Sequence, residues 1–175
     1  MKDRMSGIEV REYRFEDGGS IPNNPTLPLL VYAQALAEHE RNPSRCKDLL
    51  ARNGWGGAWV DGVFPYHHYH STSHEVLCVV GGWARITFGG PEGETVAVEA
   101  GDVVIIPTGV GHCRQSSSGG FSVVGAYPKG QESYDLRTGE ERERPGVLEN
   151  IRGVPLPETD PLFGGEGPLL RHWSG

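Results

Sequence analysis

Short apolar runs separated by glycine-rich turns follow one another from residue 55 to residue 128. They are rich in valine, isoleucine and aromatic side chains, which is the pattern of β-strands. The strands predicted in this way are WGGAWVDGVF, EVLCVV, WARITF, TVAVEA, DVVIIP, HCRQS and FSVVGAY. Several short strands at regular spacing, with no βαβ alternation and no solenoid repeat, predict an antiparallel sandwich or barrel.

The N-terminal segment, residues 1–54, has a mixed pattern. We expect a first strand at IEVREYRF and an extended arm at SIPNNPTLPLLVY, which contains three prolines. A helix is predicted over NPSRCKDLLARNG, where Asn42 can cap the start, Pro43 suits the first helical position and Gly54 follows the last turn. AQALAEHE is compatible with a second short helix.

The C-terminal arm, residues 129–175, is rich in loops, with a short helix expected near GVLENIR. Its scattered apolar residues provide enough contacts to dock on the barrel: Leu148, Ile151, Leu156, Leu162, Phe163, Leu169, Leu170 and Trp173. We see no candidate chemistry in this arm. The whole chain, residues 1–175, is therefore expected to be one all-β domain with a barrel core at residues 55–128 and an arm on each side.

Charge and cysteine content narrow the class of protein. The formal net charge is -7 and no basic stripe occurs, which argues against a nucleic acid or an anionic membrane as partner. The three cysteines form no C-x-x-C pair and fit reduced thiols in a cytoplasmic protein. Cys113, next to His112, is interpreted as a buried structural thiol. MKDRMSGIEVREY lacks the apolar core of a signal peptide, and no apolar run approaches the ~18 residues of a membrane span.

The stretch HHYHSTSHE places four of the seven histidines in nine positions. If this stretch is extended, His68 and His70 point to one face, and His67 and Tyr69 to the other. Two imidazoles on one face can hold one metal ion, although a lone H-x-H is more often part of a polar surface loop. His67 and His74 are expected to face solvent or to support ligands from behind.

Two further donors could complete such a site. Glu75 opens the next strand, and His112 opens another strand after the turn PTGVG. Together with His68 and His70 they supply three nitrogens and one oxygen. This set suits Fe, Mn, Co, Ni, Cu or Zn better than Ca or Mg.

The spacing of these residues resembles the two signature motifs of the cupin superfamily. Gly62, His68-x-His70, Glu75 and Gly82 match every spaced position of the first motif. Gly101, Pro107-x-Gly109 and His112 match the second, except that Ser116 replaces its final asparagine. The segments IPNNP, GAYP and LPETDPLFGGEGPLL also look like those of small uncharacterised bacterial single-domain cupins.

The resemblance implies a small jelly-roll barrel in which His68, His70, Glu75 and His112 project inward near one mouth and hold one divalent transition-metal ion. Ser116 does not occupy a ligand position, so its presence puts in doubt only the role that asparagine has with substrates elsewhere in the superfamily. Because cupins commonly pair, a homodimer is expected.

Three neutral imidazoles and one carboxylate on a divalent ion leave a net charge of about +1, which favours a small anionic or enolisable substrate. Glu75 could also act as a catalytic base. Arg114 shares a strand face with His112 and Tyr66 shares one with His68, so both are candidate substrate contacts, as is Arg85. Barrel-filling side chains are expected at three other positions, namely Trp59, Phe64 and Trp83.

Three functions fit this site. The one we favour is a metal-dependent oxidoreductase of the dioxygenase type, which the ligand set resembles among cupins. The second is a redox-neutral metal-dependent isomerase or lyase, and the third is a non-enzymatic cupin that binds a small molecule. The fold alone does not separate them, because one fold carries many functions.

Overall fold

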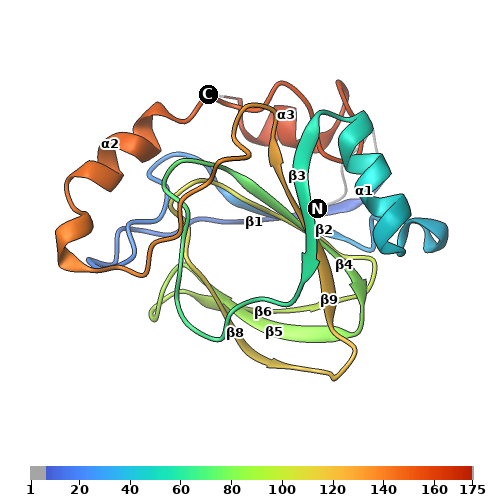
Figure 1. The fold of residues 1–175 in the computed structure, drawn as a ribbon, viewed down its shortest axis with the longest axis horizontal. Coiled ribbons are helices and arrows are strands. Elements are labelled where there is room, and N and C mark those ends of the chain that lie inside the picture. Colours follow the sequence, from blue (N-terminus) through green and yellow to red (C-terminus); the bar gives the residue numbers. More distant parts are fainter. Residues whose placement is uncertain (1–6, 175) are drawn as a thin grey trace.

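The chain, described over residues 7–174 of this computed structural model, folds around two antiparallel sheets (Figure 1). The larger sheet has the strand order β1-β2-β7-β4-β9-β3, and the smaller one has the order β6-β5-β8. The strands are β1 Glu9–Tyr13, β2 Leu29–Ala33, β3 Trp55–Asp61, β4 Glu75–Gly81, β5 Trp83–Phe88, β6 Glu94–Glu99, β7 Val103–Ile106, β8 His112–Ser117 and β9 Ser122–Pro128. The two facing sheets form the predicted all-β jelly roll, which confirms the fold class.

Both faces of the central strands β4 and β7 of the larger sheet are buried. On β4, Leu77 and Val79 pack with the residues between the two sheets, whereas Val76 and Cys78 belong to a second cluster on the opposite face. This explains why EVLCVV and DVVIIP are continuously apolar, since a strand covered on both sides has no solvent-facing positions. On β6, by contrast, only every second residue is buried, because one face of the smaller sheet meets solvent.

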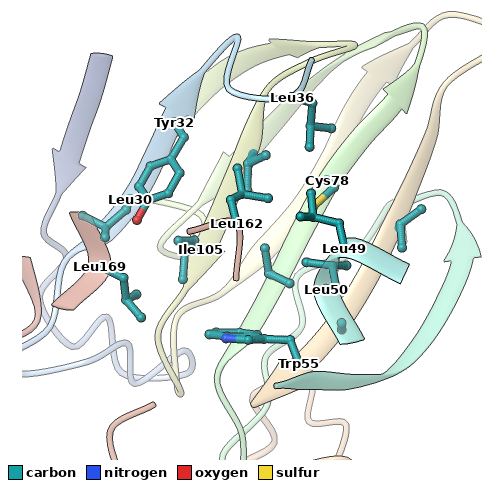
Figure 2. Close-up of a cluster of buried hydrophobic side chains, with 14 of the residues drawn as sticks. Leu30, Tyr32, Leu36, Leu49, Leu50, Trp55, Cys78, Ile105, Leu162 and Leu169 are labelled. Atoms are coloured by element: carbon teal, nitrogen blue, oxygen red, sulfur yellow. The ribbon is translucent and has the colours of Figure 1, made fainter. Parts of the chain in front are cut away.

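Helices cover the outer face of the larger sheet (Figure 1). Helix α1, Pro43–Arg52, and helix α3, Pro168–His172, both contribute side chains to the second cluster. Figure 2 shows Leu49, Leu50 and Leu169 from these helices gathered with the sheet residues Cys78 and Trp55. The apolar stripe of α1 therefore replaces solvent on a sheet face that could not remain exposed.

Helix α1 confirms the prediction for NPSRCKDLLARNG: the Asn42 side chain accepts a hydrogen bond from the backbone N–H of Arg45 at 3.2 Å, and Pro43 is the first helical residue. The predicted strand IEVREYRF is β1. The helix considered for AQALAEHE is reduced to a 3-10 turn at Glu38–Glu40.

The extended arm predicted at SIPNNPTLPLLVY is wrong in its second half. Residues Leu29–Ala33 form β2, which pairs with β1 and β7 inside the larger sheet. The three prolines of the segment, at positions 22, 25 and 28, all precede β2, so none removes a donor from the hydrogen-bond ladder. Strand formation is therefore compatible with this proline-rich sequence.

The C-terminal arm contributes Leu162, Leu169 and Trp173 to the cluster on the outer face of the larger sheet. Helix α2, Gly146–Gly153, confirms the helix near GVLENIR, whereas α3 and a 3-10 turn at Glu141–Glu143 were not predicted. Asp160 fixes the last part of the arm, because its buried carboxylate accepts hydrogen bonds from Tyr32 and from three backbone N–H groups of the arm itself. Leu156 is 51% exposed and does not take part in the docking expected of it.

Among residues 7–174 no helix is both long and apolar enough to cross a bilayer. The part of the predicted N-terminal segment before residue 7 lies outside the described residues, as does residue 175. The homodimer stays a prediction.

Candidate metal centre

The stretch from His68 to His70 is extended and lies between two other segments. His68 exchanges backbone hydrogen bonds with His112 at the start of β8, and Tyr69 exchanges them with Arg137 of the C-terminal arm. Because directly opposed residues of an antiparallel pair project to the same side, this pairing places the His68 ring beside the His112 ring, with 4.0 Å between ring centroids. The stretch is therefore extended, as the alternation of side chains inferred from the sequence requires.

The turn PTGVG brings His112 into position. The backbone N–H of Val110 donates to the carbonyl of Pro107 at 3.1 Å, and Gly109 has a φ of +90°. A Cβ at Gly109 would also lie 2.5 Å from the carbonyl oxygen of Asn23. Only glycine satisfies both conditions, which gives a physical reason for the glycine of the second motif.

Three donor groups converge in the space between the sheets. One ligand atom each from His70, Glu75 and His112 lies within 4.8 Å of the other two, and all three side chains are buried. The Oε1 atom of Glu75 is 3.5 Å from Nε2 of His70 and 3.3 Å from Nε2 of His112. Two donors bound about 2.1 Å from one ion in adjacent positions are about 3 Å apart, so the three atoms have nearly the spacing of metal ligands.

His68 is adjacent to this group but outside it. Its ring contacts the His112 ring and lies 6.2 Å, centroid to centroid, from the His70 ring. The structure thus brings three of the four expected ligands together and places the fourth at their side. The four-ligand set stays a prediction.

Backbone carbonyl groups orient the imidazoles. Nδ1 of His68 lies 2.9 Å from the carbonyl oxygen of Tyr66, and Nδ1 of His70 and of His112 face the carbonyl oxygens of Asp135 and Val110. A carbonyl oxygen only accepts, so each Nδ1 carries a proton, and in the neutral form of the ring the lone pair is on Nε2. This is the usual arrangement of histidines that bind metals through Nε2.

The two oxygens of Glu75 have different surroundings. Oε2 accepts a hydrogen bond from the Tyr127 hydroxyl at 2.9 Å. Oε1, which faces the histidines, is buried and has no hydrogen-bond partner within the described part of the chain. A buried carboxylate oxygen without a partner is costly, and a bound cation would satisfy it. The donor set therefore fits a divalent transition-metal ion.

The pKa values follow from burial and from these neighbours. Burial, followed by the nearby His112, lowers the pKa of His68 to about 3, so its imidazole is neutral near pH 7. Burial alone would raise the pKa of Glu75, but His70 and His112 hold it far below its usual range. For His70, burial is the largest influence and favours a lower pKa, but the charge and contact of Glu75 together with Asp135 outweigh it, so the pKa is raised.

The other two histidines of the stretch differ from the prediction in one respect. His67 is partly buried. His74 is fully buried rather than solvent-facing: its Nδ1 accepts from the backbone N–H of Thr108 at 2.9 Å, and its ring packs 4.8 Å from that of Trp173. Burial lowers the pKa of His74 to about 4. His74 therefore links the first motif to the C-terminal arm and faces away from the candidate centre.

A cavity of about 560 Å³ opens beside the candidate centre, and His68, His70, Glu75 and His112 all line it. Arg114 lines it too, and its Nε donates to the carbonyl of Val63 at 3.0 Å. Arg85 is exposed on β5 and lies outside the lining, because its neighbours on the strand take the inward positions.

Three aromatic residues do not lie as expected. Tyr66 is 43% exposed, stacks on Phe64 and does not line the cavity. Phe64, at 46% exposed, lines the cavity mouth, and Trp83, at 47%, faces solvent, so neither fills the barrel. Trp59 does line the interior. Its ring lies over Gly125, where a Cβ would come within 2.3 Å, and its Nε1 donates to the Tyr127 hydroxyl at 2.7 Å.

Several residues around the site were not found from the sequence. Tyr127 holds Glu75, and Tyr134 stacks on Tyr127 with 4.2 Å between ring centroids. The backbone carbonyl of Asp135 accepts a hydrogen bond from Nδ1 of His70, and the Asp135 side chain accepts one from the backbone N–H of Ser71 at 2.7 Å. Only Tyr127 could have been found from the sequence, because alternation along β9 puts its side chain on the face that points between the sheets.

Comparison with known proteins agrees with this architecture. The family profile described as "Cupin domain" matches residues 59–119. "Uncharacterized protein YjlB" of Bacillus subtilis (strain 168) is 44% identical over 165 residues, covering 94% of this chain and 97% of YjlB.

Solved structures also resemble it at low identity. Acireductone dioxygenase from Bacillus anthracis, with a cadmium ion in its active centre, is 18% identical, with 70% of this chain and 79% of that chain covered and a TM-score of 0.39. A DUF861 family protein from Thermotoga maritima is 21% identical, with 48% and 89% covered and a TM-score of 0.33. With the first signature motif complete, the second complete except at Ser116, a matching domain profile and YjlB as a relative along almost its whole length, the chain belongs to the cupin superfamily.

Proposed function

We propose that the protein is a metal-dependent enzyme of the dioxygenase type that acts on a small anionic or enolisable molecule. The observation that carries this proposal is the meeting of two imidazole Nε2 atoms and one carboxylate oxygen within 4.8 Å, at the wall of a cavity. Two histidines and one carboxylate that leave other coordination positions open are the ligand set of many non-haem iron oxygenases.

His70, Glu75 and His112 would hold the ion, with His68 as a further donor. When bound there, a divalent ion supplies a Lewis acid for a substrate oxygen and, if it is redox-active, an electron source for dioxygen. The cavity wall is mostly apolar, and Trp59, Val63 and Leu77 are among its lining residues.

Tyr127 supports Glu75 as a ligand. Burial and the nearby Glu75 raise the pKa of Tyr127 well above its usual range, so the hydroxyl stays protonated and donates to Oε2. This leaves Oε1 directed at the histidines. A catalytic role for Glu75 as a base stays a prediction.

Metal analysis of protein purified without an affinity tag tests the first half of the proposal. We expect close to one transition-metal ion per chain in the wild type and a loss of most of it in Glu75→Gln, because the amide removes the negative charge. Glu92→Gln, in the loop between β5 and β6, is the control and should keep its metal. Wild-type protein that takes up none of the six candidate metals would contradict the proposal.

Oxygen consumption tests the second half. Protein reconstituted separately with Fe(II), Mn(II), Ni(II) and Zn(II) is assayed with keto acids, enediols and catechols in an oxygen electrode. We expect substrate-dependent oxygen uptake with a redox-active metal and none with zinc. Turnover that continues with zinc or without oxygen would replace the dioxygenase proposal by a redox-neutral isomerase or lyase.

A further inference from the structure

The cavity beside the candidate centre has an apolar rim that is open to solvent. Seven large apolar side chains are exposed among the described residues, and four of them line this one cavity, namely Val60, Phe64, Tyr134 and Leu136. They are 39–46% exposed and come from β3, from the connection to β4 and from the C-terminal arm. Scattered exposed apolar residues need no explanation, but a group around an opening marks a binding site for an apolar surface.

One positively charged side chain, that of Arg114, lines the same cavity. Arg114 is the single lysine or arginine on the lining, and within the part of the chain that the structure describes it has no ion-pair partner. Its Nε is used by the carbonyl of Val63, which fixes the guanidinium and leaves its terminal nitrogens as donors. Two carboxylates among the described residues line the cavity, Glu75 and Asp61. Asp61 is exposed and accepts a hydrogen bond from the backbone N–H of Gly62, and in the described structure it forms no ion pair with Arg114.

We propose that this cavity binds a small carboxylate with an apolar or aromatic body. Arg114 holds the carboxylate by a bidentate contact, and the rim residues Phe64, Tyr134 and Leu136 enclose the body. This inference rests on the proposed function only in placing the reactive end of the molecule at the candidate centre. A volume of about 560 Å³ is within the range of small-molecule pockets.

The register of β8 sets the length of the molecule. His112 and Arg114 are two residues apart on this strand and both line the cavity. Two residues of a strand span about 6.6 Å. A molecule whose carboxylate is a few bonds from its reactive group therefore reaches both side chains, whereas a two- or three-carbon acid satisfies one of them and leaves the rim uncovered.

Three matched compounds separate the two contacts: 3-phenylpropanoate, its neutral amide 3-phenylpropanamide, and the short acid propanoate. Binding is measured by titration calorimetry on the full chain, once after chelator treatment and once after metal loading. In both forms we expect 3-phenylpropanoate to bind about tenfold or more tightly than either of the others, because the amide loses the charge-assisted contact and propanoate loses the apolar burial. Equal affinity for the three compounds, or no saturable binding of 3-phenylpropanoate at millimolar concentration, overturns the inference.

Substitutions with matched controls locate the contacts. Arg114→Gln should remove the preference for the acid over the amide, and Arg114→Lys should keep part of it, whereas Arg85→Gln, on an exposed arginine outside the cavity, should change nothing. Leu136→Ser should weaken 3-phenylpropanoate several-fold, and Leu156→Ser, at a similarly exposed leucine outside this cavity, should not. An unchanged acid preference in folded Arg114→Gln protein contradicts the inference, and if that variant does not fold, the comparison of acid and amide on the wild type decides.

The two forms of the protein keep the two proposals apart. One outcome is a protein that retains no metal and still distinguishes the three compounds after chelator treatment. That result supports the carboxylate site and contradicts the proposed function. Metal binding and oxygen uptake without discrimination among the compounds support the proposed function and remove the carboxylate site.

Discussion

The barrel core, residues 55–128, and the C-terminal arm both reach the candidate metal centre, but they contribute different atoms to it. The barrel supplies the side chains of His68, His70, Glu75 and His112, together with Tyr127 behind Glu75. The arm supplies a backbone carbonyl to His70, a carboxylate that holds the loop after His70, and two side chains of the cavity rim. The ligand groups are thus encoded by one part of the chain and held in place by another.

This difference indicates which substitutions should remove a metal ligand and which should only change the orientation of a ligand. A ligand that is lost removes one of the donor atoms that bind the ion. A supporting contact that is lost leaves the ligand present but less well oriented. Metal affinity and stability should therefore respond differently in the two regions.

The largest effect is expected at a ligand in the barrel. His70→Ala should lower the affinity for a divalent transition metal by more than ~100-fold, beyond what the loss of a supporting contact produces. His67→Ala, three positions earlier and outside both the donor group and the cavity lining, should leave the affinity within a few-fold of wild type. The measurement is a competition titration with a chromogenic chelator. Similar losses in the two variants would remove the distinction between ligand and neighbour.

A smaller effect is expected in the arm at Asp135. Its side chain accepts from the backbone N–H and hydroxyl groups of both Ser71 and Thr72 and forms an ion pair with Arg137 at 2.9 Å. Asp135→Ala should weaken metal binding about tenfold and lower the free energy of unfolding by about 2 kcal/mol, since it frees the loop after His70 and leaves partly buried donors unpaired.

Asp135→Asn is the control, because its amide oxygen can still accept from the backbone of Ser71. It should retain most of the metal affinity. If Asp135→Ala loses stability but binds metal like the wild type, the arm only covers the barrel and does not position His70.

The smallest effect is expected where the arm meets the N-terminal segment. Arg144 forms two hydrogen bonds with the carboxylate of Asp17, each 2.7 Å long, and this contact holds the pKa of Asp17 below its ordinary value. A folded-state pKa below the unfolded one means that the contact stabilises the protein above the unfolded pKa and that this stability is lost as the pH falls through the folded pKa. Because the pair is partly exposed, Asp17→Asn should cost less than ~1 kcal/mol near neutral pH.

Urea unfolding near neutral pH and at acid pH checks this prediction. The difference between wild type and Asp17→Asn should shrink in acid, where the wild-type carboxylate is protonated, and metal affinity should be equal in the two proteins near neutral pH. A difference that does not change with pH would show that the ion pair is not its source.

The sequence by itself determined the strands of the barrel and indicated candidate ligands, three of which the structure brings together. Both depend on local rules: alternation along a strand puts His68 and His70 on one side, and the glycines of PTGVG allow the turn before His112. Helix α1 was predictable for the same reason, since Asn42, Pro43 and Gly54 act on the adjacent backbone.

Tertiary structure decided which face each strand buries and what stands behind the ligands. Leu29–Ala33 became a strand because β1 and β7 lie on either side of it, and His74 is buried because the C-terminal arm covers it with Trp173. The contact between His70 and Asp135 joins residues 65 positions apart, through a backbone carbonyl that every residue type possesses. Side-chain spacing contains no signal for such a contact, so only the packing of the arm on the barrel determines it.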